Sequence, residues 1–316
     1  MGFETTTDEV IAGIDLRGRT ALVSGATTGL GLETARTLAR AGATVIIGSR
    51  SAAKGDDAVA AVRARVPDAT LSHVRMDLAD LASVRACADA VLERADALHI
   101  VVANAGIMFT PEGRTVDGHE LQFGTNHLGH FVFVNRLVPL LVAGAPSRVV
   151  VLSSGAHTIS DIVWDDPDFQ SRPYDKFEAY GQSKTANALF AVELDRRLRP
   201  FGVRANSVHP GMIMTDLARH MDADDLAELG RRAASNAEAG TGRGMPAFKS
   251  VEQGAATSVW AAVAPELAEV GGAYLADAEI RVDEARPYAL DPDAARRLWA
   301  LSEELVGETF DPPVGG

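Results

Sequence analysis

Residues 20–31 read TALVSGATTGLG, a short apolar run followed by a loop with three glycines, and the helical pattern LETARTLARAG comes next. Glycine lets the backbone turn tightly and approach a ligand closely, and the free N–H groups at a helix start favour an anion. A dinucleotide-binding turn requires this order of strand, glycine loop and helix. The alternative is a helix start with chance glycines. The residues that we predict to contact phosphates are Ser24, Gly25, Thr27, Thr28, Gly29, Leu30 and Gly31.

The rest of the chain continues this alternation of short apolar runs and helix-length segments. Apolar runs without strict polar alternation suit strands that are buried on both faces, as in a parallel sheet. Strands that alternate with helices imply right-handed crossovers and a doubly wound sheet. We therefore predict an α/β Rossmann fold with about seven strands and helices on both faces. The six clearest runs are residues 20–24, 44–48, 71–75, 100–103, 149–152 and 203–208.

We predict a single domain over residues 15–290, with an extension at 1–14 and a tail at 291–316 that covers a neighbour or is loose. Residues 161–175 are polar and contain proline, so we expect an inserted loop there. Residues 216–244 are rich in Ala, Asp, Glu and Arg, which is compatible with a helix and a mobile exit. Such excursions from the carboxyl ends of strands usually form the substrate side, so we expect a substrate loop at about 212–248.

Composition excludes several classes of partner. The net charge of −13 argues against binding to nucleic acid, whose phosphates require a basic surface. No apolar stretch reaches about 18 residues, and the first ten residues do not resemble a secretory signal. The single cysteine, Cys87, cannot form an internal disulfide, and no Cys/His cluster has the spacing of zinc ligands. We therefore expect a cytoplasmic protein with no metal and no membrane partner.

The second apolar run suggests which nucleotide binds. A carboxylate some ~20 residues after the glycine turn would bind the ribose hydroxyls of NAD. Here the run ends in Ser49-Arg50, and no acid follows until Asp56. Arginine can pair with a 2′-phosphate, which a carboxylate would repel. We therefore favour NADP(H), bound by Ser49 and Arg50, over NAD(H). Alternatively, Arg50 opens the next helix in solvent or stacks on adenine.

Tyr180 and Lys184 stand four residues apart and so share one face of a helix. A free tyrosine has a pKa of about 10, and a neighbouring cation favours the phenolate, which would give an acid/base for hydroxyl–carbonyl interconversion. A pair at the helix surface is the alternative. Ser153 and Ser154 follow the run at 149–152, where a hydroxyl can orient a substrate oxygen. Asn126 interrupts an apolar helical stretch, either as a satisfied core residue or as the holder of a water chain to Lys184.

Taken together, these residues resemble the short-chain dehydrogenases/reductases over residues 15–274. The matching features are the glycine turn, Asp77, the Asn104-Ala105-Gly106 triplet, Asn126, Ser154, Tyr180 with Lys184, and PGMIMT at 210–215. Within the family, the sequence motifs most resemble those of the branch that contains retinol dehydrogenases and the WW-domain oxidoreductase. These motifs are NHLGHF at 126–131, SSGAH at 153–157, SKTAN at 183–187 and HPG at 209–211. Ser24 stands where the family usually has threonine. No membrane anchor precedes the domain, so we expect no membrane-bound role.

The resemblance implies a role for each catalytic candidate. Tyr180 would donate or accept the proton, and Ser154 would position the substrate oxygen, with Ser153 as the rival. Lys184 would bind the nicotinamide ribose and tune Tyr180, and Asn126 would support the proton relay. The implied cofactor contacts are Asp77, Leu78, Asn104, Ala105, Gly106, Tyr180, Lys184, Pro210, Gly211, Ile213 and Thr215. The histidines that match the branch, which we interpret as structural, are His127, His130 and His157.

We thus expect an NAD(P)-dependent oxidoreductase acting on a hydrophobic ketone, aldehyde or secondary alcohol. The residues that could line an apolar pocket, or else pack in the core, are Phe109, Met212, Met214 and Phe248. A nucleotide sensor would be expected to lose Tyr180 or Lys184, and a dehalogenase to have a spoiled glycine turn. A lyase or an epimerase on the same fold is the remaining alternative. The resemblance also implies a homodimer or homotetramer in which the helices around Asn126 and Tyr180 pair between subunits.

Overall fold

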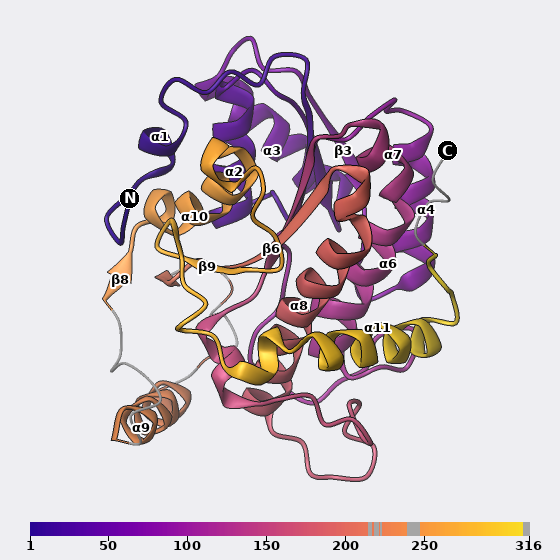
Figure 1. Cartoon of the computed structure of the whole chain (residues 1–316), viewed down its shortest axis with the longest axis vertical. Helices are drawn as coiled ribbons and strands as arrows, with labels where there is room; N and C mark the ends of the chain where they lie inside the picture. Colours follow the sequence, from indigo (N-terminus) through magenta and orange to yellow (C-terminus); the bar gives the residue numbers. More distant parts are fainter. Residues whose placement is uncertain (214–216, 218–220, 222, 239–246, 312–316) are drawn as a thin grey trace.

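The computed structural model consists of a mostly parallel sheet between two layers of helices (Figure 1). It describes residues 1–213, 217, 221, 223–238 and 247–311. The predicted doubly wound fold is confirmed, but the sheet has eight strands in the order β10-β9-β6-β5-β4-β1-β2-β3. The strands are β1 (Thr20–Ser24), β2 (Thr44–Ser49), β3 (Leu71–Arg75), β4 (Ile100–Ala103), β5 (Ser147–Leu152), β6 (Val203–His209), β9 (Tyr274–Ala276) and β10 (Glu279–Ile280). The eighth strand, β10, is a two-residue edge strand antiparallel to β9, too short to be read from its sequence.

Helices follow most strands, as the alternation predicted. The α-helices are α1 (Thr7–Val10), α2 (Gly29–Arg40), α3 (Ala52–Arg65), α4 (Leu81–Leu92), α5 (Leu121–Phe123), α6 (Gly129–Arg136), α7 (Val138–Ala143), α8 (Lys176–Leu198), α9 (Ala223–Glu238), α10 (Val251–Val263) and α11 (Pro292–Val306). The other helical turns are η1 (Gly124–Leu128), η2 (Gly155–Ile159), η3 (Arg199–Phe201), η5 (Pro265–Leu267) and η6 (Pro287–Leu290). A separate parallel pair joins β7 (Met212–Ile213) to β8 (Phe248–Lys249).

The two faces of the sheet bury two different cores. Successive side chains of a strand point to opposite faces, so Leu22 of β1 joins the core under α4, α6 and α8, whereas Ala21 and Val23 join the core under α2 and α10. Figure 1 shows these helices on the two sides of the sheet. Because both faces are covered, the central strands carry apolar residues at nearly every position, which is the pattern that indicated a parallel sheet.

The chain reverses its direction of winding at β1. This strand pairs with β2 on one side and with β4 on the other, both in parallel. The loops that leave the carboxyl ends of β1 and β4 therefore diverge to opposite faces and open a crevice between them. Ligands of doubly wound sheets bind in such a crevice.

Residues 292–306, which we expected to be a loose tail or a cover for a neighbour, form α11 and pack on their own chain. The ring of Trp299 lies 5.0 Å from Phe131 of α6 and 5.9 Å from Phe190 of α8, measured between centroids. Figure 1 shows α11, in yellow, beside α8. The cause is an apolar face at helical spacing, which must be buried. Helix α11 therefore contacts part of α6 and α8, the helices that the resemblance implied for subunit pairing, and that pairing stays a prediction.

The extension at residues 1–14 also packs on the domain. Val10 and Ile11 are buried in the core under α2 and α10. The Thr7 hydroxyl donates a hydrogen bond of 2.6 Å to Glu33 of α2. Within the part of the chain that the structure describes, no helix combines the length and apolarity needed to cross a bilayer.

Candidate active site

The glycine turn after β1 is built so that only glycine fits. Gly25 has φ 65°, and a Cβ there would lie 2.8 Å from the Cβ of Ala105. A Cβ on Gly31 would lie 2.6 Å from the Gly25 carbonyl oxygen. Thr28, which precedes α2, makes no side-chain hydrogen bond to the first turn of that helix. The N–H groups at the start of α2 are thus free of a capping side chain, an arrangement that suits a pyrophosphate.

Ser24, which we predict to contact the cofactor, also links neighbouring segments through its hydroxyl. Its hydroxyl is buried and accepts hydrogen bonds from the N–H groups of Asn104 (2.9 Å) and Ala105 (3.0 Å). It also lies 2.9 Å from Nε2 of His130, whose Nδ1 contacts the Asn126 carbonyl at 3.0 Å. The hydroxyl therefore joins the loops after β1 and β4 on either side of the crevice, and both ring nitrogens of His130 contact protein oxygens.

The residues after β2 and β3 lie at the same edge of the sheet, because these strands are parallel neighbours. Arg50 is exposed and has no ion-pair partner among the residues that the structure describes. Ser49 is buried, and its hydroxyl donates to the Ser51 carbonyl at 2.9 Å. An oxygen of the Asp77 carboxylate accepts the N–H of Ala79 at 3.1 Å. A free guanidinium therefore stands where the ribose phosphate of an NADP would be expected.

Asn126 lies in η1, a π-helical turn between α5 and α6. Turns of this type inside helices are frequent at functional sites. The amide NH₂ of Asn126 donates to the Ile107 carbonyl (2.9 Å) and to the Ser183 hydroxyl (3.0 Å), and its oxygen accepts the Ile107 N–H (2.8 Å). A Cβ on Gly106 would lie 3.1 Å from Oδ1 of Asn126 and 3.7 Å from Nζ of Lys184. Asn126 and Lys184 thus border the same small space beside Gly106.

The two serines after β5 point in different directions. The Ser153 hydroxyl is buried and donates to the Lys184 carbonyl at 2.8 Å. The Ser154 hydroxyl lies beside the phenol of Tyr180 and acts to lower the pKa of that phenol. It is Ser154, therefore, that the fold brings to Tyr180. Nζ of Lys184 lies 5.5 Å from the centre of the Tyr180 ring and donates to the Leu152 carbonyl at 2.9 Å.

Burial sets the protonation of this pair. It raises the pKa of Tyr180 to about 12, while the hydrogen bond with Ser154 acts in the opposite direction. It also lowers the pKa of Lys184 to about 8. We expected Lys184 to lower the pKa of Tyr180, but in the protein alone desolvation prevails. The ammonium lies beside the ring and donates to a carbonyl rather than to the phenol oxygen, so in the protein alone it does not offset the desolvation of the phenol.

An apolar cluster surrounds the phenol of Tyr180. The ring of Phe109 packs edge-on to Tyr180 at 5.0 Å, and Phe177 lies 4.6 Å from Phe109. Phe109 has φ 50°, a left-handed conformation that is strained for a residue other than glycine. Sequence reasoning missed Phe177, although it precedes Tyr180 by three residues on the same helix and therefore shares its face. The other residues packed against this cluster are Met108, Ala156, Ile159, Met221 and Leu229.

Two of the predicted pocket residues lie elsewhere. Phe248 is 53% exposed and pairs with Met212 in the small β7–β8 sheet, so neither joins the cluster around Tyr180. The small sheet also holds Ile213, and the left-handed Gly211 (φ 91°) precedes it. Met214 and Thr215 lie outside the described residues, as does the expected exit at 239–244.

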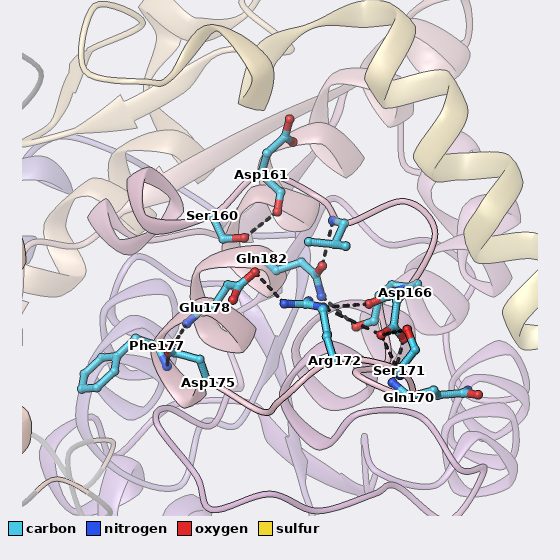
Figure 2. Close-up of polar contacts among 12 residues, drawn as sticks. Ser160, Asp161, Asp166, Gln170, Ser171, Arg172, Asp175, Phe177, Glu178 and Gln182 are labelled. Carbon is cyan, nitrogen blue, oxygen red and sulfur yellow. Dashed lines mark hydrogen bonds and ion pairs between the residues drawn. The ribbon is translucent and has the colours of Figure 1, made fainter.

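The predicted loop at 161–175 is tied to itself and to α8. Figure 2 shows Arg172 between Asp166 and Glu178, with an ion pair of 2.6 Å to Glu178. The carboxylate of Asp166 accepts the N–H groups of Gln170 (2.7 Å) and Ser171 (2.9 Å). These bonds hold the loop against the first turns of the helix that carries Tyr180.

Helix α9 reaches the same end of α8 through two ion pairs. Asp225 lies 2.5 Å from Lys176, and Arg232 lies 3.0 Å from Asp175. Leu229, between them, packs against the apolar cluster. Part of the expected substrate loop is therefore a helix whose inner face borders the space beside Tyr180.

Comparison with known proteins agrees with this geometry. The family model described as short chain dehydrogenase matches residues 19–226. Human retinol dehydrogenase 13 is 40% identical over 294 residues, which cover 92% of this chain and 85% of that protein. The crystal structure of an uncharacterised protein from Mycobacterium paratuberculosis has a TM-score of 0.75 and 34% identity, and the match covers 99% of this chain and 100% of that one. A short chain dehydrogenase from Burkholderia cenocepacia, solved in complex with NADP, has a TM-score of 0.63 and 28% identity over 83% of this chain and 96% of its own.

The match thus extends over most of the chain and includes the glycine turn, Ser154, Tyr180 and Lys184. The resemblance to the retinol dehydrogenase branch is confirmed by the relatives found. This protein belongs to the short-chain dehydrogenases and is a nicotinamide-dependent oxidoreductase of that family.

Proposed function

We propose that this protein transfers hydride between NADP(H) and a hydrophobic ketone, aldehyde or secondary alcohol, with Tyr180 as the acid/base. The observation that carries this proposal is the phenol of Tyr180 inside an apolar cluster, with the Ser154 hydroxyl beside it, in a chain whose glycine turn suits a pyrophosphate. The nicotinamide, when bound, supplies or accepts the hydride. All other steps belong to side chains of this chain.

The protein's own groups would move one proton and hold one oxygen. In carbonyl reduction, Ser154 and Tyr180 would donate hydrogen bonds to the substrate oxygen and polarise it. As the oxygen gains charge, Tyr180 would release its proton to it. Lys184, a cation near the ring, would stabilise the phenolate that remains. Asn126 would hold the backbone at Ile107 in place through the hydrogen bond to its N–H. Alcohol oxidation would run through the same contacts in reverse.

NADP(H) is favoured by the free guanidinium of Arg50 and by the absence of a carboxylate at the end of β2. The related dehydrogenase from Burkholderia cenocepacia, solved with NADP, supports the same choice. The proposed cofactor contacts remain those of the glycine turn, Arg50, Asp77, Asn104 and Gly106, with Ser49 and Lys184 nearby. The 2′-phosphate would sit against Arg50, which can bind two of its oxygens at once.

The hydrophobic substrate is suggested by the aromatic and aliphatic side chains around Tyr180. Phe109, Phe177 and Leu229 form an apolar wall near the phenol, against which an apolar carbonyl compound would bind better than a charged one. Because relatives are named retinol dehydrogenases, retinal belongs in the substrate panel. A cytoplasmic location and a homodimeric or homotetrameric assembly remain predictions.

The first experiment is a fluorescence titration with NADPH and NADH, followed by a screen of hydrophobic ketones and aldehydes. Tyr180→Phe should lower kcat by about a thousandfold or more and leave the Kd for NADPH within about twofold, because the ring still packs but no proton is available. Tyr174→Phe, which removes the hydroxyl of a second, half-buried phenol, is the matched control. Equal turnover by wild type and Tyr180→Phe would rule out the assigned acid/base.

Cofactor choice is tested separately with Arg50→Ala. We expect the Kd for NADPH to rise about tenfold while the Kd for NADH stays within about twofold, since only NADPH has the phosphate that Arg50 would contact. Arg65→Ala, an exposed arginine at the end of α3, should change neither value. Parallel losses for the two nucleotides would show that Arg50 does not select the phosphate.

A further inference from the structure

Two histidines outside the proposed catalytic set hold the peptide bond next to Ser154. The carbonyl oxygen of Ser154 lies 2.7 Å from Nδ1 of His157. The N–H of Gly155, at the other end of that peptide bond, donates to Nδ1 of His209 at 3.1 Å. Both polar groups of the Ser154–Gly155 peptide are therefore bound by imidazole rings, one from the turn η2 and one from the end of β6.

The remaining contacts assign a tautomer to each ring. Nε2 of His157 accepts the N–H of Arg286 at 3.1 Å, so the proton must be on Nδ1, where it can be donated to the Ser154 carbonyl. Nδ1 of His209 accepts the N–H groups of both Gly155 and Gly211 (3.3 Å), so its proton must be on Nε2. The two rings are neutral and in opposite tautomers.

Neutrality is consistent with the surroundings of both rings. His157 is buried against Tyr274 of β9, whose ring centre lies 4.9 Å away, and the hydroxyl of Tyr288 donates to its backbone carbonyl. Burial lowers the pKa of each of the two histidines to about 4. The nearby charges are Arg286 beside His157, and Asp277 and Lys249, themselves an ion pair, beside His209.

The arrangement connects the serine turn to the loop of the predicted nicotinamide contacts. β5 and β6 are parallel neighbours, with Leu152 opposite Val208, so the chain leaves both strands side by side. One nitrogen of His209 then binds the first N–H of the serine turn, at Gly155, and the N–H of Gly211 in the cofactor loop. A shift of this ring would change the distance between the hydroxyl of Ser154 and the cofactor.

We propose that His157 and His209 form a histidine clamp, that is, two neutral rings in opposite tautomers that position the Ser154 hydroxyl for catalysis. Neither ring touches substrate or cofactor in this assignment, so both are positioning residues. The clamp rests on the proposed function, since it matters for turnover only if Ser154 orients the substrate oxygen. Reorienting that hydroxyl by a fraction of an ångström would lower kcat without unfolding the protein.

The tautomers can be tested without any substrate. Long-range N–H correlation spectra of histidine labelled with nitrogen-15, at about pH 7.5, distinguish Nδ1–H from Nε2–H rings. We expect an Nδ1–H pattern that disappears in His157→Asn and an Nε2–H pattern that disappears in His209→Asn. A doubly protonated ring at either position, or the opposite tautomer, would overturn the clamp whether or not the protein is an oxidoreductase.

The effect on catalysis is tested with paired substitutions. The Asn side chain keeps the Nδ1-like group, a donor at 157 and an acceptor at 209, whereas Leu removes it. Per folded protein, His157→Leu should lower kcat about thirtyfold with an unchanged KM for cofactor, and His209→Leu should also raise that KM because Gly211 loses its partner. The Asn variants should recover to within about fivefold of wild type.

A matched control lies at the other end of the sheet, where Nδ1 of His99 accepts the Thr20 N–H at 3.0 Å. His99→Leu removes the same kind of bond and should leave kcat unchanged. Leu variants with wild-type kcat, or Asn variants as impaired as the Leu variants, would overturn the positioning role. If wild type turns over no substrate at all, the proposed function fails, and the spectra still decide the tautomers.

Discussion

At the scale of single residues, desolvation decides the protonation of the proposed acid/base. Tyr180 and Lys184 are both buried, and burial favours the neutral form of each. The pKa of Tyr180 rises to about 12 and that of Lys184 falls to about 8. The free enzyme at neutral pH therefore holds a protonated phenol beside an ammonium that is close to losing its proton, a state prepared for carbonyl reduction.

This state predicts the alkaline limb of the pH profile. For carbonyl reduction, kcat/KM should be level below about pH 8 and fall above it, because the ammonium of Lys184 that would stabilise the Tyr180 phenolate loses its proton first. Initial rates between about pH 6 and 10, at subsaturating carbonyl substrate, provide the measurement. A kcat/KM for reduction that increases steadily up to pH 10 would contradict this assignment.

At the scale of elements, α8 is the helix that holds the site together. It begins after Asp175, whose carboxylate accepts the N–H groups of Phe177 (2.8 Å) and Glu178 (2.9 Å). The same carboxylate pairs with Arg232 of α9. One side chain thus caps the helix that carries Tyr180 and also anchors the helix that borders the substrate space.

The double role can be separated with two cap substitutions. Asp175→Ala and Asp291→Ala, the latter at the start of α11, should each lower the free energy of unfolding by about 1 kcal/mol, as the loss of an N-cap usually does. Only Asp175→Ala should also raise KM for the hydrophobic substrate, because only it releases Arg232. Urea unfolding and steady-state kinetics give the two values, and equal KM for both variants would exclude α9 as a wall of the substrate site.

At the scale of the whole molecule, the fold buries histidines as neutral rings. Burial lowers the pKa of His130, His157 and His209 to about 4 and that of His127 to about 3. The unfolded chain binds these protons near pH 6.5, so between about pH 6.5 and 4 it takes up protons that the native state excludes. The contribution of these buried neutral rings to the free energy of unfolding is therefore fully present above about pH 6.5 and is lost as the pH falls.

The free energy of unfolding should thus decrease from about pH 7 to 5, with each such histidine contributing up to about 1.4 kcal/mol per pH unit. His119 acts in the opposite sense, because its hydrogen bond to Asp168 raises its pKa, and it offsets part of the loss. Urea midpoints at about pH 7, 6 and 5 measure the slope. His127→Gln, which removes one of the four rings, should reduce it, and a midpoint independent of pH would show that the rings are not buried neutral.

The sequence alone determined whatever depends on neighbours along the chain. The periods of two residues in strands and 3.6 residues in helices predict the order of elements and the shared face of Tyr180 and Lys184. The conformational freedom of glycine predicts the turn after β1. The family resemblance was likewise readable, because its motifs are short and local.

Only the tertiary structure decided which partner each polar group has. Ser24 meets Asn104, which lies 80 residues away in sequence, and His209 meets Gly155, which lies 54 away. The tertiary structure also placed Ser154 rather than Ser153 beside Tyr180 and packed residues 292–306 against α8. Burial in that structure shifts the pKa values of Tyr180 and Lys184. No local period encodes these contacts, because they arise where parallel strands end side by side and where a distant helix covers an apolar face.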